Sequence, residues 1–180
     1  IAQYNYVITK YPKTKLEPVI YYSIGDAHFN MEKYDSAIVN YEKVLSNFPS
    51  SQYVFDAVNG IQYSYVAKGN PGKAVVFLGE FVSKNPGLSY ADQLMFKKGE
   101  IYYSLREYDK AILVYKNFTS AYPNSKLVVD GYYWIGKSAE NLGQSEEAIL
   151  NFDRVLKNYK SSELASASVL EIGNIYRLQK

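Results

Sequence analysis

The sequence has no cysteine, a single histidine and a single tryptophan among its 180 residues. Without cysteine the chain cannot form disulfides, thiolate metal sites or a cysteine nucleophile, and one imidazole cannot build a histidine-rich metal cluster. No apolar run approaches the roughly 18 residues that a membrane-spanning helix needs. Neither sign of charge dominates, because 20 Lys and Arg oppose 18 Asp and Glu and leave a net charge of +2. That balance gives no reason to predict binding to nucleic acid or to a membrane surface.

Tyrosine is abundant instead, with 20 residues, and hydrophobic residues make up 47% of the chain. This apolar content and a charged fraction of 21% argue against a disordered chain. The length suits one domain or one short repeat array. The composition therefore predicts a folded chain with a sizeable core.

A period of 37 residues runs through the sequence in three separate columns. Proline, alanine and glycine each recur at this spacing, and Gln62 interrupts the glycine column. Three columns with one spacing are not expected by chance, so the sequence predicts a structural repeat. The columns are Pro12, Pro49, Pro86 and Pro123; Ala37, Ala74, Ala111 and Ala148; and Gly25, Gly99, Gly136 and Gly173.

Each 37-residue unit has the pattern of two helices. Apolar residues recur at the three- and four-residue spacing of one helix face over residues 91–104 and again over residues 108–118. The glycine of the first helix and the alanine 12 residues later, on the second, are predicted to let the two helices approach closely. No single pair can bury its apolar stripe alone, so neighbouring pairs must stack. The sequence therefore predicts an all-α solenoid.

The repeat resembles the tetratricopeptide repeat. The shared pattern is Gly-x2-(Tyr/His)-x5-Tyr-x2-Ala-Ile-x2-Tyr with a terminal Pro, and the second unit departs from it at Gln62 and Pro71. The resemblance implies a right-handed α-solenoid of antiparallel helix pairs that binds proteins and has no catalytic activity or cofactor. The matching residues are Gly25, His28, Tyr34, Ala37, Ile38, Tyr41 and Pro49, and again Gly99, Tyr102, Tyr108, Ala111, Ile112, Tyr115 and Pro123.

The resemblance divides the chain into one array. We expect the second helix of a half-repeat at 1–17, full repeats at 18–54, 55–91, 92–128 and 129–165, and the first helix of a half-repeat at 166–180. Ile1 lies in the column of Ile38, so we interpret the sequence as a fragment of a longer protein. The two half-repeats are also predicted to allow head-to-tail self-association, in which the last helix of one copy docks on the first helix of another.

The strings Tyr122-Pro123-Asn124-Ser125-Lys126 and Tyr132-Tyr133-Trp134-Ile135-Gly136 are similar to those of one bacterial subgroup. That subgroup includes the periplasmic Tol–Pal-associated protein and the outer-membrane β-barrel assembly lipoprotein. The resemblance implies a cell-envelope protein that is periplasmic or associated with the outer membrane. A cytoplasmic location remains the alternative.

The sequence offers no evident set of catalytic residues. As a general base His28 would need a nucleophile and an orienting carboxylate, and Asp26, two residues away on a helix, points elsewhere. His28 also shares its column with Tyr65 and Tyr102, which indicates a packing role. The segment Gly69-Asn70-Pro71-Gly72 lacks the spacing of a phosphate-binding loop and is predicted to be a turn. We therefore predict no enzyme activity, no cofactor and no metal site.

The resemblance implies that first helices line a concave surface that contacts a partner. Rigid amphipathic rings on such a surface suit the anchoring of a peptide or helix, although each ring could instead pack between adjacent first helices. A glycan-binding module is the alternative function, since flat rings also stack on sugars, and RNA is disfavoured by the absence of a basic stripe. The predicted partner-binding residues are Tyr22, Asp26, Phe29, Asn59, Tyr63, Phe96, Glu100, Tyr103, Tyr133, Trp134, Lys137 and Asn141.

Overall fold

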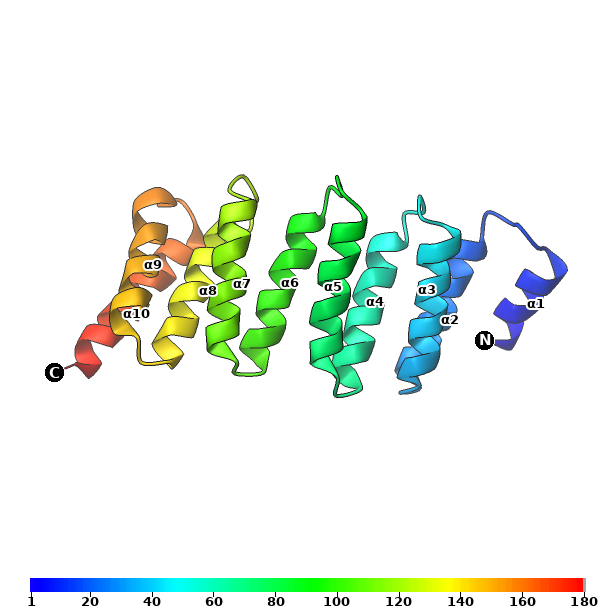
Figure 1. The fold of residues 1–180 in the computed structure, drawn as a ribbon, viewed down its shortest axis with the longest axis horizontal. Coiled ribbons are helices and arrows are strands. Elements are labelled where there is room, and N and C mark those ends of the chain that lie inside the picture. Colours follow the sequence, from blue (N-terminus) through cyan, green and yellow to red (C-terminus); the bar gives the residue numbers. More distant parts are fainter. Residues whose placement is uncertain (180) are drawn as a thin grey trace. The chain divides into compact units, whose positions relative to one another are not determined.

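The computed structural model describes residues 1–179, which form ten α-helices and no strand (Figure 1). The helices are α1 (Ala2–Lys10), α2 (Glu17–Asn30), α3 (Tyr34–Asn47), α4 (Val54–Ala67), α5 (Pro71–Lys84), α6 (Ala91–Ser104), α7 (Tyr108–Ala121), α8 (Val128–Asn141), α9 (Ser145–Asn158) and α10 (Glu163–Leu178). None of these helices is long and apolar enough to cross a membrane.

The helices repeat with the period of the sequence. The first helices α2, α4, α6 and α8 begin at residues 17, 54, 91 and 128, which are 37 residues apart. The second helices α3, α5, α7 and α9 begin at residues 34, 71, 108 and 145, with the same spacing. Each predicted full repeat therefore begins one residue inside its first helix. The predicted C-terminal half-repeat contains most of α10, and its last residue, 180, lies outside the described residues.

The chain divides into two compact units, residues 1–81 and residues 82–180. In the first unit α2 packs against α3, and α3 packs against α4. In the second unit each helix from α6 to α10 packs against the next one along the chain. Successive helices within a unit run antiparallel, as Figure 1 shows. That the repeats form one array, and that two copies associate through residues 1–17 and 166–180, stay predictions.

The core of each unit is built from the predicted columns. All four alanines of the alanine column are fully buried. Large side chains of the second helices surround them, including Tyr41 and Val44 in the first unit and Tyr115 and Phe152 in the second. The apolar stripe of each second helix thus faces a first helix, which is the packing that the spacing predicts.

The glycine column lies against aromatic rings of the second helices, whereas the sequence predicts the alanine column as its partner. A Cβ atom on Gly25 would lie 2.5 Å from the ring of Tyr41, and one on Gly136 would lie 2.6 Å from the ring of Phe152. Each glycine therefore makes room for an aromatic ring 16 residues later on the second helix. The nearby ring, and not the alanine of the second helix, explains why these positions of the first helix have no side chain.

The second repeat, which departs from the pattern, follows the same rule. The position 16 residues after Gln62 is Leu78, where the other repeats have Tyr41, Tyr115 and Phe152. Both Gln62 and Leu78 are fully buried. Leucine is smaller than an aromatic ring, and in this repeat the position of the glycine carries a buried side chain.

Candidate functional site

A pocket in the first unit gathers every partner-binding residue that the sequence predicts there. Its volume is about 340 Å³, the lower end of the range of small ligand sites. The first helices α2 and α4 supply most of its lining, and α3 supplies one ring. We call it the α2–α4 pocket; its lining residues are Tyr22, Asp26, Phe29, Tyr41, Asp56, Asn59, Gly60 and Tyr63.

Two glycines allow the ring of Tyr41 to form part of the pocket. A Cβ atom at either Gly25 or Gly60 would lie 2.5 Å from this ring, so the ring lies directly against the backbones of α2 and α4. Its hydroxyl donates a hydrogen bond of 2.6 Å to the carboxylate of Asp26. The tyrosine of the second helix thereby fixes an acidic side chain of the first.

The pocket is acidic. Asp26 comes from α2 and Asp56 from the first turn of α4, and no lysine, arginine or histidine stands among the described residues that line the cavity. Burial raises the pKa of Tyr22 to about 12, and the charges of Asp26 and Asp56 add to the shift. Burial also raises the pKa of Tyr41, together with its hydrogen bond to Asp26. Both tyrosines stay neutral at pH 7, so the two aspartates set the charge of the site.

Aromatic side chains form the walls. Tyr22 stacks on Tyr53 with ring centroids 5.8 Å apart, and Phe29 meets Tyr34 edge to face at 5.5 Å. These contacts fix the two rings of α2. Tyr63 on α4 keeps 49% of its surface exposed. The pocket thus combines two partly buried rings that pack on neighbours with the more exposed ring of Tyr63.

Sequence reasoning missed three lining residues. Asp56 lies three and seven residues before Asn59 and Tyr63, which is the spacing of one helix face, so this signal was present in the sequence. Gly60 lies on the same face, but glycine has no side chain from which a partner contact could be predicted. Tyr41 belongs to a second helix, where the sequence predicts no partner contact, and only the two flanking glycines bring it into the site.

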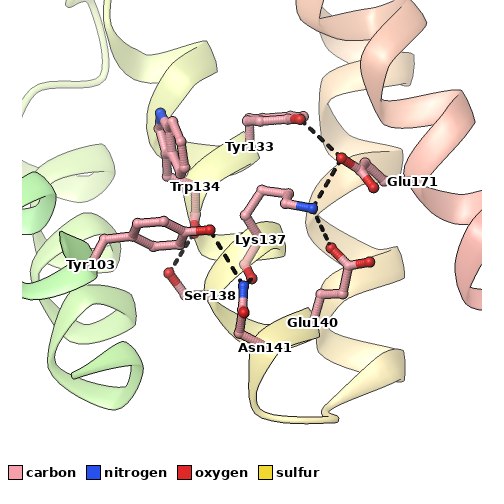
Figure 2. Close-up of polar contacts among 8 residues, drawn as sticks. All are labelled: Tyr103, Tyr133, Trp134, Lys137, Ser138, Glu140, Asn141 and Glu171. Carbon is pink, nitrogen blue, oxygen red and sulfur yellow. Dashed lines mark hydrogen bonds and ion pairs between the residues drawn. The ribbon is translucent and has the colours of Figure 1, made fainter. Parts of the chain in front are cut away.

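In the second unit the predicted residues contact one another instead (Figure 2). Tyr103 on α6 packs edge to face on Trp134 of α8 with ring centroids 4.7 Å apart. Tyr133 packs on the buried ring of Phe152 at 5.5 Å. The amide of Asn141 donates a 3.3 Å hydrogen bond to the hydroxyl of Tyr103. Packing between neighbouring helices accounts for these side chains.

Lys137 holds two helices of this unit together. Its ammonium group lies 2.6 Å from Glu140 on the same helix and 3.0 Å from Glu171 on α10. Tyr133 donates a hydrogen bond to the same Glu171 oxygen (Figure 2). Burial alone would lower the pKa of Lys137, but the hydrogen bonds to Glu140 and Glu171 outweigh it, and the pKa lies above its ordinary value. The charge of Lys137 is therefore paired with two carboxylates of the same chain.

Two predicted site residues of α6 also have structural partners. Phe96 is 6% exposed and packs on Tyr115 and Phe118, with ring centroids 5.1 and 5.3 Å apart. Its ring belongs to the core, which corrects its placement on the partner-binding face. Glu100 lies 2.5 Å from the ammonium group of Lys97 on the same helix.

The imidazole of His28 is partly buried. Its Nδ1 atom is buried and makes no hydrogen bond to any residue within 1–179. Within the same residues no group of three or more His, Cys, Asp or Glu side chains could hold a metal ion. His28 lies on α2, in the column where packing was predicted.

The tyrosines of two equivalent positions lead to a paired prediction. Tyr41 donates to Asp26, whereas the buried hydroxyl of Tyr115 makes no hydrogen bond to a described residue. Replacing Tyr41 with phenylalanine should lower the free energy of unfolding by about 1.5–3 kcal/mol, because a hydrogen bond to a charged group is lost. Replacing Tyr115 with phenylalanine should leave stability unchanged or raise it, because an unsatisfied polar atom is removed.

Urea unfolding of the two variants measures the difference. Phe152 occupies the same column in the fourth repeat, so a phenylalanine ring fits this position. Equal losses in both variants would contradict the assignment of the Asp26 hydrogen bond.

Models of known protein families match three segments of the chain. Two models, both described as tetratricopeptide repeat, match residues 18–51, 93–125 and 130–162, which together are more than half of the sequence. No curated protein matches the sequence.

Solved structures share the fold at low identity. The crystal structure of MamA is 21% identical over 88% of this chain and 85% of that one, with a TM-score of 0.60. A tetratricopeptide repeat protein from Parabacteroides merdae is 15% identical over 99% of this chain and 65% of that one, with a TM-score of 0.62. A thermophilic TPR protein from Thermus thermophilus is 16% identical over 93% of this chain and 86% of that one, with a TM-score of 0.55. These likenesses confirm the predicted all-α helical solenoid.

Proposed function

Because the chain belongs to the tetratricopeptide-repeat family, we propose that it is a non-catalytic scaffold that binds a peptide or helix of a partner protein on its first helices. Proteins of this family are generally interaction scaffolds. The α2–α4 pocket is the place on the first unit where this contact is centred.

The observation that supports this proposal is the convergence of predicted residues in one cavity. Tyr22, Asp26 and Phe29 reach it from α2, and Asn59 and Tyr63 reach it from α4. A pocket that combines fixed rings with a few polar groups is the usual form of a specific anchor site. The equivalent residues of the second unit already have partners within the chain, so the partner contact is assigned to the first unit.

The proposed setting is a bacterial envelope assembly, in the periplasm or at the outer membrane. The support is the likeness of the segments around Pro123 and Trp134 to those of envelope proteins with this repeat. Fractionation of the source cells tests the location, and recovery of the protein with cytoplasmic markers would contradict it.

A photo-crosslinking amino acid at position 63 tests the proposed function. Tyr63 lines the pocket, whereas Leu113 on α7 is 60% exposed and lies outside it, so position 113 is the matched control. We expect position 63 to crosslink to a defined protein partner in lysate of the source cells and position 113 not to. The same products at both positions, or retention on glycan arrays with no protein crosslinked at position 63, would contradict the proposal.

A further inference from the structure

The α2–α4 pocket surrounds its space with groups that attract cations. Two carboxylates reach it from different helices, and the rings of Tyr22, Phe29, Tyr41 and Tyr63 form its walls. Ring faces and carboxylates both favour a positive charge, and they favour it more strongly where water is partly excluded. The net charge of the whole chain is +2, so this negative character is local to the site.

The chain itself fills the equivalent place of the second unit. Each lining residue has a counterpart 74 residues later, and there Trp134 takes the position of Gly60 and Lys137 that of Tyr63. Trp134 puts an indole ring where Gly60 has no side chain, and Lys137 adds an ammonium group that pairs with carboxylates. In the first unit positions 60 and 63 are glycine and tyrosine, so these two positions add neither an indole ring nor an ammonium group.

The size and polar groups of the pocket fit one long basic side chain. A volume of about 340 Å³ is small for a folded segment, so a single side chain is the natural occupant. A guanidinium group has five donors in one plane, and the lining offers it the acceptor oxygens of Asp26, Asp56 and Asn59. Its flat face also stacks on aromatic rings, which an ammonium group does less well.

We propose that the α2–α4 pocket binds an arginine side chain presented by the partner peptide. The inference rests on the proposed function and specifies the chemistry of the partner. The aspartates select the charge, and the rings of α2 and α4 hold the stem and face of the guanidinium group.

Two acetylated nine-residue glycine–serine peptides test the inference, one with a central arginine and one with a central citrulline. Citrulline has nearly the shape of arginine but no charge. Titration of the isotope-labelled chain, read from the backbone amide signals of Asp56, Asn59 and Gly60, should give an affinity about tenfold higher for the arginine peptide.

A charge-matched pair of variants locates the effect. Asp56 is exposed and makes no ion pair with a described residue, so Asp56→Asn should leave the fold intact. We expect this variant to bind the arginine peptide about three- to tenfold more weakly and to bind the citrulline peptide with unchanged affinity. Asp109→Asn makes the same charge change in the first turn of α7 and should alter neither affinity.

The failures of the two proposals can be told apart. Equal shifts of these amides by both peptides would overturn the arginine inference and leave peptide binding intact. Absence of any shift would also overturn it, while the crosslinks from position 63 decide the proposed function. Displacement of the arginine peptide by millimolar CaCl2, with saturable shifts from CaCl2 alone, would identify an ion site and overturn the inference.

Discussion

Replacing Gly136 with alanine is expected to lower the free energy of unfolding by about 1–3 kcal/mol. The new Cβ atom would lie 2.6 Å from the ring of Phe152, closer than any real contact. That ring is fully buried and packs on Tyr133, so it cannot move aside without disturbing its neighbours. At a helix position with free space around the new Cβ atom, the same change would raise the free energy of unfolding by about 0.5–1 kcal/mol, because glycine weakens a helix.

The same column provides the control. A Cβ atom on Gly173 of α10 would meet nothing within 4 Å, so Gly173→Ala should be neutral or stabilising. Adding Phe152→Leu to Gly136→Ala should recover part of the loss, since the second repeat already combines Gln62 with Leu78. Urea unfolding of the three variants measures these changes. A loss in Gly173→Ala as large as in Gly136→Ala would show that helix geometry, and not the ring, excludes a side chain.

Replacing Trp134 with alanine should cost about 2–4 kcal/mol in the free energy of unfolding, somewhat less than for a fully buried tryptophan. Its indole ring lies 4.7 Å from the ring of Tyr103 and 5.8 Å from that of Tyr133, measured between centroids. The change removes the ring contact between α6 and α8 and leaves the hydrogen bond from Asn141 to Tyr103.

Thermal and urea unfolding of Trp134→Ala measure this cost, with Leu113→Ala as the exposed control. Leu113 is 60% exposed, so its truncation should change stability by less than about 0.5 kcal/mol. Equal stability of Trp134→Ala and the parent chain would show that the ring is free for a partner. The expected loss means that alanine at position 134 is a poor control for binding, because it disturbs the fold.

The periodic columns of the sequence were sufficient to predict the helices. Columns spaced by 37 residues report a repeated backbone geometry, and the apolar spacing within each unit reports which helix faces are buried. Both signals depend on local chain geometry, so they survive in the second repeat despite Gln62 and Pro71. The helix starts accordingly follow the predicted period.

The candidate site could be predicted only in part. Equivalent positions of a repeat look alike in sequence, and Tyr22 and Phe96 were therefore assigned the same role. In the structure Tyr22 lines a pocket, whereas Phe96 packs on Tyr115 and Phe118 in the core. The residues that decide between these outcomes lie on neighbouring helices, and the period alone does not identify them.

The sequence by itself determined the helix pairs, their order and the buried alanine column, because these follow from spacing along one chain. Only the tertiary structure decided which predicted residues face an open pocket. Gly60 leaves room for the ring of Tyr41 and for the cavity, whereas Trp134 in the same column packs its indole on Tyr103. The physical reason is that a pocket is the volume that side chains from several helices leave unfilled, and that volume is set by their contacts in space.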